Sequence, residues 1–164
     1  MSFTDLAKKR CSIRAYETKP VESEKIAAIV EAAHVAPSAA NRQPVRLIQV
    51  ESAEGLANLG RYANLYGAPL AFIVCADAKR AWKRPVDGMV STAIDASITC
   101  DHMMIAATDL GLGSVWICAF DPAGVREAFN LPASLVPVNI LAVGHAADEW
   151  KSPERHAVER IPVQ

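Results

Sequence analysis

An unbroken apolar segment near the middle of the chain is the feature that most restricts its fold. Residues 70–74 read Leu-Ala-Phe-Ile-Val, and Pro69 and Cys75 flank them. This run is far shorter than the roughly 18 apolar residues that a membrane-spanning helix needs. It is typical of a strand that is buried within a protein core. We therefore predict a buried strand at 69–75, which other elements must cover.

The remaining segments alternate between helical and extended patterns. Apolar residues at helical spacing, with proline and acidic start signals, predict helices at 4–9, 20–37, 53–65, 89–109 and 121–129. Short apolar runs predict further strands at 45–50, 114–118 and 136–143. Taken alone, this alternation suggests a doubly wound parallel sheet, although the spacing does not reveal strand direction.

Composition and charge exclude several classes of protein. The chain has 164 residues, which fits a single domain over 1–164. Its formal net charge of −1 argues against a nucleic-acid or anionic-membrane partner. The N-terminus lacks the apolar stretch of a secretory signal. The four cysteines are widely separated, which predicts no metal site and suits the reducing cytoplasm. We expect a cytoplasmic protein with no membrane segment.

The first motif with chemical potential is Arg10-Cys11-Ser12-Ile13-Arg14, directly after the first helix. In an extended segment, alternation places Arg10, Ser12 and Arg14 on one side. Two guanidinium groups and a hydroxyl are suitable donors to phosphate oxygens. The alternative is a solvated loop whose arginines pair with surface carboxylates.

A second motif, A-P-S-A-A-N-R-Q-P, spans residues 36–44 between a helix and a strand. Two prolines restrict its shape and small residues leave its backbone accessible, so it can lie against a flat ring and offer amide groups. In the alternative interpretation it is an ordinary connection, in which Asn41 and Gln43 bond the loop's own backbone.

A third motif, G-L-G-S-V-W-I-C-A-F-D, spans residues 111–121. It is not the dinucleotide fingerprint G-x-G-x-x-G, because Trp116 stands where the third glycine would be. It is not a P-loop either, because no Gly-Lys-Ser/Thr follows. By itself, a glycine-rich turn into a short strand is more typical of packing than of catalysis.

Taken together, the three motifs resemble those of the nitroreductase family of FMN-dependent NAD(P)H oxidoreductases, in its short members. Their order and spacing agree, and the resemblance covers residues 6–143. It implies an α+β fold with a mixed, mostly antiparallel central sheet flanked by helices, in place of the parallel sheet. It also implies an intertwined homodimer with FMN at the interface, in which residues 145–164 form a C-terminal arm that crosses the partner subunit.

The activity that the resemblance implies is an oxidoreductase reaction. Hydride would pass from NADH or NADPH through flavin N5 to an electron-poor small molecule, such as a nitroaromatic or a quinone, with ping-pong kinetics. The cofactor supplies the chemistry, so no catalytic side chain and no metal are expected. Two alternatives remain open. One is a non-catalytic protein that stores or senses FMN, and the other is a flavoenzyme of the same fold with a different reaction, such as reductive dehalogenation.

The resemblance also assigns cofactor-binding positions. Those around the phosphate and ribityl chain are Arg10, Cys11, Ser12 and Arg14, with Arg155 of the tail closing on the phosphate. The loop that the partner lays against the isoalloxazine corresponds to Pro37, Ser38 and Ala39, shaped by Asn41 and Gln43. The strand beside flavin N5 and O4 corresponds to Trp116, Ile117, Cys118 and Ala119. Arg61 and Asn64 fall where some relatives have polar flavin contacts.

The chain departs from the family pattern at two places. Val45 stands where an aromatic residue usually follows the Gln-Pro pair, and Cys118 and Ala119 stand where many relatives have glycine. Cys118 also allows a rival hypothesis, a thiol-based redox enzyme, if a helix N-terminus or a cation stabilises its thiolate. The same hypothesis applies to Cys11, because it lies beside the cation Arg10.

A basic loop at 79–84 carries four cationic residues around Trp82. It is either solvated surface or a lid that binds the extra phosphate of NADPH. The second hypothesis predicts that charge reversal at Lys83 and Arg84 raises KM for NADPH but not for NADH.

Overall fold

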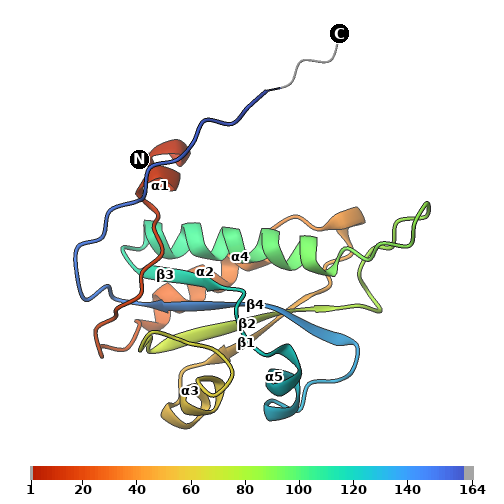
Figure 1. Cartoon of the computed structure of the whole chain (residues 1–164), viewed down its shortest axis with the longest axis horizontal. Coiled ribbons are helices and arrows are strands. Elements are labelled where there is room, and N and C mark those ends of the chain that lie inside the picture. Colours follow the sequence, from red (N-terminus) through yellow and green to blue (C-terminus); the bar gives the residue numbers. More distant parts are fainter. Residues whose placement is uncertain (1, 161–164) are drawn as a thin grey trace.

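One sheet lies between two layers of helices in this computed structural model, which describes residues 2–160 (Figure 1). The five α-helices are α1 (Phe3–Lys9), α2 (Ser23–His34), α3 (Ala53–Leu59), α4 (Thr92–Asp109) and α5 (Pro122–Ala128). The four strands are β1 (Val45–Val50), β2 (Leu70–Asp77), β3 (Gly113–Ile117) and β4 (Leu135–Gly144). Helices α2 and α4 cover one face of the sheet, and α3 and α5 cover the other.

The sheet has the strand order β1-β2-β4-β3, and every pair of neighbouring strands is antiparallel. One parallel bridge, between Ser12 and Ser114, adds the segment after α1 to the β3 edge. The doubly wound parallel sheet is therefore wrong, and the mixed, mostly antiparallel sheet is confirmed. Strand direction depends on which strands pair in space, and hydrophobic spacing carries no information about that.

Strands β2 and β4 form the centre of the sheet. Residues 70–76 of β2 are all buried, as the apolar run predicts. The register between β2 and β4 shifts between Val74 and Cys75, at the point where Cys75 pairs with Pro137. Proline has no amide hydrogen for the ladder, so an irregularity at this point is the expected accommodation.

Local signals account for the helix boundaries. Ser2 and Asp5 form a reciprocal capping box at the start of α1. Asp121 caps α5, and Pro122 occupies its first turn. Helix α3 ends at Leu59, so the helix predicted over 53–65 is too long.

The reason for this early end is tertiary. The chain beyond Leu59 turns back toward the end of β3, where Ala63 bridges to Phe120 and the amide of Asp121 donates to the Tyr62 carbonyl at 3.0 Å. The segment that sequence spacing assigned to a helix is therefore a loop, and it is the loop that builds the pocket described below.

Two apolar layers hold the sheet in place. On one face, Ile29 of α2 and Met103 of α4 pack with Phe72 and Leu141. On the other, Leu59 and Val125 pack with Ile73 and the rest of the second layer. Both layers pack on the same sheet, and no disulfide joins the described residues.

Glu22 joins the start of α2 to the segment after β4. Its carboxylate accepts from Lys19 Nζ at 2.9 Å and lies 3.1 Å from His145 Nε2. The hydrogen bond from Lys19, aided by the charge of His145, lowers the pKa of Glu22 to about 2.

This lowered pKa predicts an acid-dependent loss of stability. The contribution of Glu22 is fully present above its usual pKa of 4.5 and is lost as pH falls from there through about 2. In Glu22→Gln this part of the acid limb disappears, so the free energy of unfolding of the variant falls less steeply between pH 4.5 and pH 2. Urea unfolding across this range measures the difference. Glu24→Gln, on the same turn and without a described ion pair, is the control and keeps the wild-type slope.

None of the helices within residues 2–160 combines the length and hydrophobicity that crossing a bilayer requires. The same residues contain no group of three or more His, Cys, Asp or Glu side chains close enough together to hold a metal ion.

Candidate cofactor site

The segment 10–14 docks on the β3 edge. The amide of Ile13 donates to the Ser114 carbonyl at 2.9 Å, and the Ile13 side chain is buried. The hydroxyl of Tyr16 donates to the Ile13 carbonyl at 2.9 Å and fixes the segment from the other side. Because Ile13 points inward, the alternating neighbours Ser12 and Arg14 face outward.

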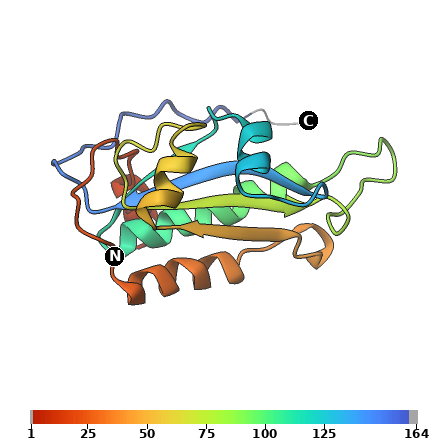
Figure 2. The same cartoon turned by 90° about the horizontal axis from the view of Figure 1, so that it is seen from below.

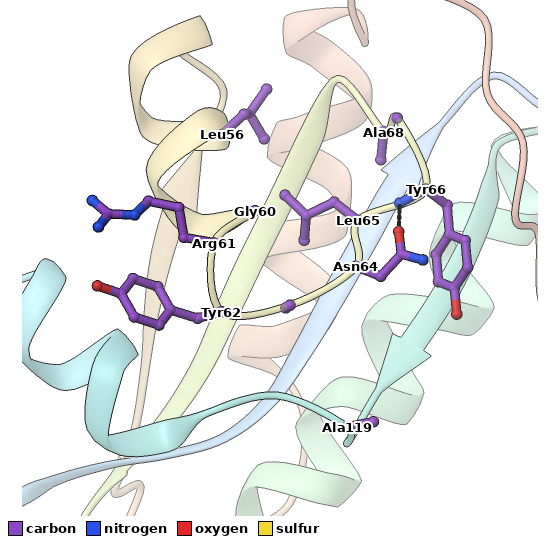
Figure 3. A pocket seen from close by; sticks show the side chains of 11 residues that line it. Leu56, Gly60, Arg61, Tyr62, Asn64, Leu65, Tyr66, Ala68 and Ala119 are labelled. Atoms are coloured by element: carbon purple, nitrogen blue, oxygen red, sulfur yellow. Dashed lines mark hydrogen bonds between the residues drawn. The ribbon is translucent and has the colours of Figure 1, made fainter.

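Arg14 connects this segment to a pocket. Its guanidinium carbon lies 5.9 Å from the ring centroid of Tyr66, a cation–π geometry. Tyr66 belongs to the loop between α3 and β2, which Figure 3 shows next to the end of β3. The first motif is therefore adjacent to this loop in space, although about 50 residues separate them in sequence.

The pocket has a volume of about 650 Å³, within the usual range for small-molecule sites. Its lining is the 60–68 loop together with Leu56 of α3 and, on the opposite side of the loop, Ala119 (Figure 3). Asn64 Oδ1 accepts the amide of Tyr66 at 2.9 Å, which holds Tyr66 at a left-handed φ of +56°. Arg61 and Asn64, which sequence reasoning placed near the cofactor, both line this pocket.

Of the third motif, the residue that lines this pocket lies just after strand β3 and not within it. Ala119 lines the pocket, and Cys118 beside it is exposed. Ile117 is buried against the layer of α3 and α5. Trp116 points to the other face, where its Nε1 donates to Asn139 Oδ1 at 2.6 Å. Side chains at 116 and 117 therefore stabilise the core, and only their backbone can border a ligand at this edge.

These groups fit a flavin phosphate and ring. Outward-facing Ser12 and Arg14 supply hydrogen-bond donors for phosphate oxygens, with Arg10 four residues before Arg14. Tyr66 and Asn64 add an aromatic face and a polar edge beside a cavity of sufficient size. In addition, no hydrogen-bond partner is described for the buried Ser114 Oγ, under the docked segment.

The second motif lies elsewhere. Figure 2 places the 36–44 loop at one end of the sheet and the 10–14 segment at the other. The amide of Ala39 donates to Asp95 Oδ1 in the first turns of α4 at 2.8 Å. Cys11 and Ile13 share a depression with Thr108, near the last turn of α4. At 1.5 Å per residue, Asp95 and Thr108 are about 20 Å apart along the helix. One chain does not bring the two motifs together.

The 36–44 loop has a defined and strained shape. The amide of Gln43 donates to Ser38 Oγ, and its side chain donates to Asn41 Oδ1, both at 2.9 Å. Ala40, Asn41 and Gln43 have left-handed φ values near +50°. With Tyr66, they are four of the five non-glycine residues in this conformation among the described residues. Such strain concentrates at functional sites, where surrounding contacts must maintain it.

Asp95 is a residue that sequence reasoning missed. It is completely buried, and besides Ala39 it accepts the hydroxyl of Ser91 at 2.7 Å. A carboxylate buried in this way must be hydrogen-bonded, and here the hydrogen bonds hold the 36–44 loop to α4. The sequence signal that could have identified Asp95 was its position on the core side of α4, next to the buried Ala96 and four residues before the buried Thr99.

The outer face of α4 carries apolar side chains that the chain itself leaves open. Ile94 is 48% exposed, and Ile98 and Ile105 on the same stripe are half-buried. Val30 of α2 and Val35 after it are also exposed, so both helices carry open apolar side chains. Large exposed apolar patches mark interaction sites, which makes these two helices a candidate contact surface.

The tail after β4 passes the first motif and then leaves the body. Ser152 Oγ donates to the Arg10 carbonyl at 3.1 Å. Arg155 lies near Thr4 and Lys8 of α1, on the outer side of the first motif. Beyond it, the described tail extends away from the domain (Figure 1). Residues 161–164 of the predicted arm lie outside the described residues.

Comparisons with known proteins show the family of this chain. The model of the family described as "Nitroreductase family" matches residues 7–64 and 53–145. The chain belongs to the nitroreductase family. A crystal structure of a nitroreductase family protein from Clostridium difficile 630 is 49% identical, with a TM-score of 0.92 over 99% of this chain and 94% of that one.

Two further nitroreductase relatives have more specific names. The FMN-dependent nitroreductase of Clostridium difficile R20291 is 29% identical, with a TM-score of 0.80 over 93% of this chain and 92% of that one. The FMN reductase (NAD(P)H) of Bacillus subtilis 168 is 34% identical over 92% of this chain and 68% of its own length.

Within the described residues, none of the four cysteines takes part in a disulfide. All four are free thiols, and burial raises the pKa of Cys75 to about 12 and that of Cys100 above its usual value. Cys118 is exposed. At the nearby N-terminus of α5, the Ala123 amide already donates a hydrogen bond to Asp121 Oδ1 at 3.0 Å, so this amide is not free to stabilise a thiolate at Cys118. The structure therefore gives no geometric support to the thiol hypothesis at Cys118.

Gly113 allows the first motif to dock on the sheet. A Cβ at this position would lie 2.7–2.9 Å from three carbons of the Ile13 side chain. Gly113→Ala is expected to push the 10–14 segment off β3, to cost about 1–3 kcal/mol of stability and to weaken FMN binding. Thermal unfolding and FMN titration measure the two effects. Adding Ile13→Ala removes two of the three clashing carbons, and failure of this double variant to recover FMN affinity would contradict the explanation.

Proposed function

We propose that this nitroreductase is a homodimeric, FMN-dependent oxidoreductase. It passes hydride from NADH or NADPH to an electron-poor small molecule, such as a nitroaromatic or a quinone, in a ping-pong reaction. The observation that carries the proposal is the division of the site. The pocket beside the 10–14 segment lies toward one end of the sheet, and the strained 36–44 loop lies at the other end.

A second copy of the chain completes the site. Its 36–44 loop would cover the pocket of the first copy, and the open apolar faces of α2 and α4 would become the contact between them. Residues 145–160 of the tail leave their own domain past α1, which suits an arm that reaches the partner. The names of the Clostridium difficile and Bacillus subtilis relatives support FMN as the cofactor.

Bound FMN would supply the two-electron chemistry, and the residues of the chain would position it. Arg10, Ser12 and Arg14 would hold the phosphate and ribityl chain, and Cys11 shapes the same segment. Pro37, Ser38 and Ala39 of the partner would exclude water from the ring, with Asn41 and Gln43 fixing their loop. Backbone amides at Cys118 and Ala119 would donate to the ring edge and favour its electron-rich, reduced form.

An absorbance spectrum of the purified protein, before and after anaerobic addition of NADPH or NADH, tests this function. We expect flavin bands that bleach with a reduced nicotinamide and return when a nitroaromatic or quinone is added. Flavin that stays oxidised with both donors would contradict the proposal and indicate an FMN-storing or sensing protein. A protein that neither contains nor takes up FMN would overturn it.

A further inference from the structure

The loop between β2 and α4 forms a basic pocket that the proposed cofactor site does not use. This depression of about 470 Å³ is lined by Arg42, Lys79, Arg80, Ala81, Trp82 and Lys83. Its four cations come from two segments, since Arg42 follows directly on the 39–41 turn of the cofactor loop. Figure 2 shows both segments at the same end of the sheet.

None of the four cations of this basic pocket takes part in an ion pair within residues 2–160. The ion pairs of the described residues involve Lys19, Lys25, Arg84 and His145 instead. The nearby Asp77 uses its Oδ1 to accept a hydrogen bond from the backbone amide of Lys79 at 3.0 Å. Arg84 is bound to Asp87 through two hydrogen bonds of 2.8 and 2.7 Å and does not line the pocket. Arg84 therefore braces the loop, contrary to its place in the lid hypothesis.

Hydrogen bonds connect the basic pocket rigidly to the cofactor loop. Two hydrogen bonds join Trp82 to Ser91. The amide of Trp82 donates to Ser91 Oγ at 3.1 Å, and the amide of Ser91 donates to the Trp82 carbonyl at 2.9 Å. Ser91 donates in turn to the buried Asp95, which also holds the amide of Ala39. In the proposed dimer, a ligand that reaches the flavin under this loop would therefore lie close to the basic pocket of the same subunit.

We propose that this pocket binds the adenosine 2′-phosphate of NADPH and makes the enzyme prefer NADPH over NADH, which rests on the proposed function. A phosphate monoester carries nearly two negative charges at neutral pH, and arginine forks match its oxygens. Trp82 offers a ring face for the adenine. NADH has a neutral hydroxyl at this position, so it gains nothing from the four cations.

Calorimetric titration with 2′,5′-ADP and with 5′-AMP tests the pocket without turnover. We expect the wild type to bind 2′,5′-ADP at least about tenfold more tightly than 5′-AMP, since charge-assisted hydrogen bonds to the extra phosphate add to affinity. Arg80→Gln/Lys83→Gln loses this preference. Lys19→Gln, a charge loss near the start of α2, is the matched control and keeps it. Equal affinity of the wild type for both ligands, or an unchanged preference in the double variant, would overturn the proposal.

Steady-state kinetics of the FMN-loaded protein give the second readout. The ratio of kcat/KM for NADPH to that for NADH is expected to fall about tenfold in Arg80→Gln/Lys83→Gln, and to stay within twofold of the wild type in Lys19→Gln. An unchanged ratio would overturn the assignment. If 2′,5′-ADP binds as expected and the protein takes up no FMN, the proposed function fails while the phosphate site stands.

Discussion

Replacing Ile94 with aspartate is expected to give a folded monomer that no longer retains FMN. Ile94 lies on the outer stripe of α4 and is already 48% exposed in the single chain, so the chain itself tolerates a charge there. In the proposed homodimer the same position is buried at a two-fold interface, and each interface then contains the substitution twice. Burying an unpaired carboxylate costs several kcal/mol per ion, which corresponds to about a 10³-fold weaker dimer or more.

Sedimentation or size-exclusion chromatography measures the mass, circular dichroism the fold, and flavin absorbance the bound FMN. Ala57→Asp is the matched control, because Ala57 is an exposed apolar residue of α3 on the opposite face of the sheet. This control should remain dimeric and yellow. If Ile94→Asp stayed dimeric with full FMN occupancy, the open face of α4 would not be the subunit interface.

Removing both arginines of the first motif is expected to abolish tight FMN binding. Hydrogen bonds to charged groups contribute about 1.5–3 kcal/mol each, so Arg10→Ala/Arg14→Ala should raise the FMN dissociation constant by about 10²–10⁴-fold. The segment itself is held by the Ile13 amide and the Tyr16 hydroxyl, and neither hydrogen bond involves an arginine side chain. The variant should therefore fold as the wild type does.

Fluorescence titration of the apoprotein with FMN and with riboflavin measures this effect. Riboflavin lacks the phosphate, so its affinity should change much less than that of FMN. Arg10→Lys/Arg14→Lys keeps both charges without the planar fork and should recover part of the FMN affinity. Equal losses for FMN and riboflavin would place the arginines away from the phosphate.

The sequence alone indicated where each helix and strand lies, except for the end of α3, and its local chemistry explains why. Strand β2 is a run of apolar residues, and α5 begins where Asp121 and Pro122 supply a cap and a first turn. The motifs also indicated the family, and with it the fold, because the residue types that hold a phosphate and approach a ring are few. Neither conclusion needed to know which segments meet in space.

Only the tertiary structure decided strand direction, the end of α3 and the partners of isolated polar residues. Antiparallel pairing, the pocket loop around Tyr66 and the hydrogen bonds of Asp95 to Ala39 and Ser91 all join segments that are distant in sequence. Hydrophobic periodicity reports whether a residue is buried, and says nothing about the element that buries it. The physical reason is that packing and buried hydrogen bonds are satisfied between elements, so a local pattern cannot specify them.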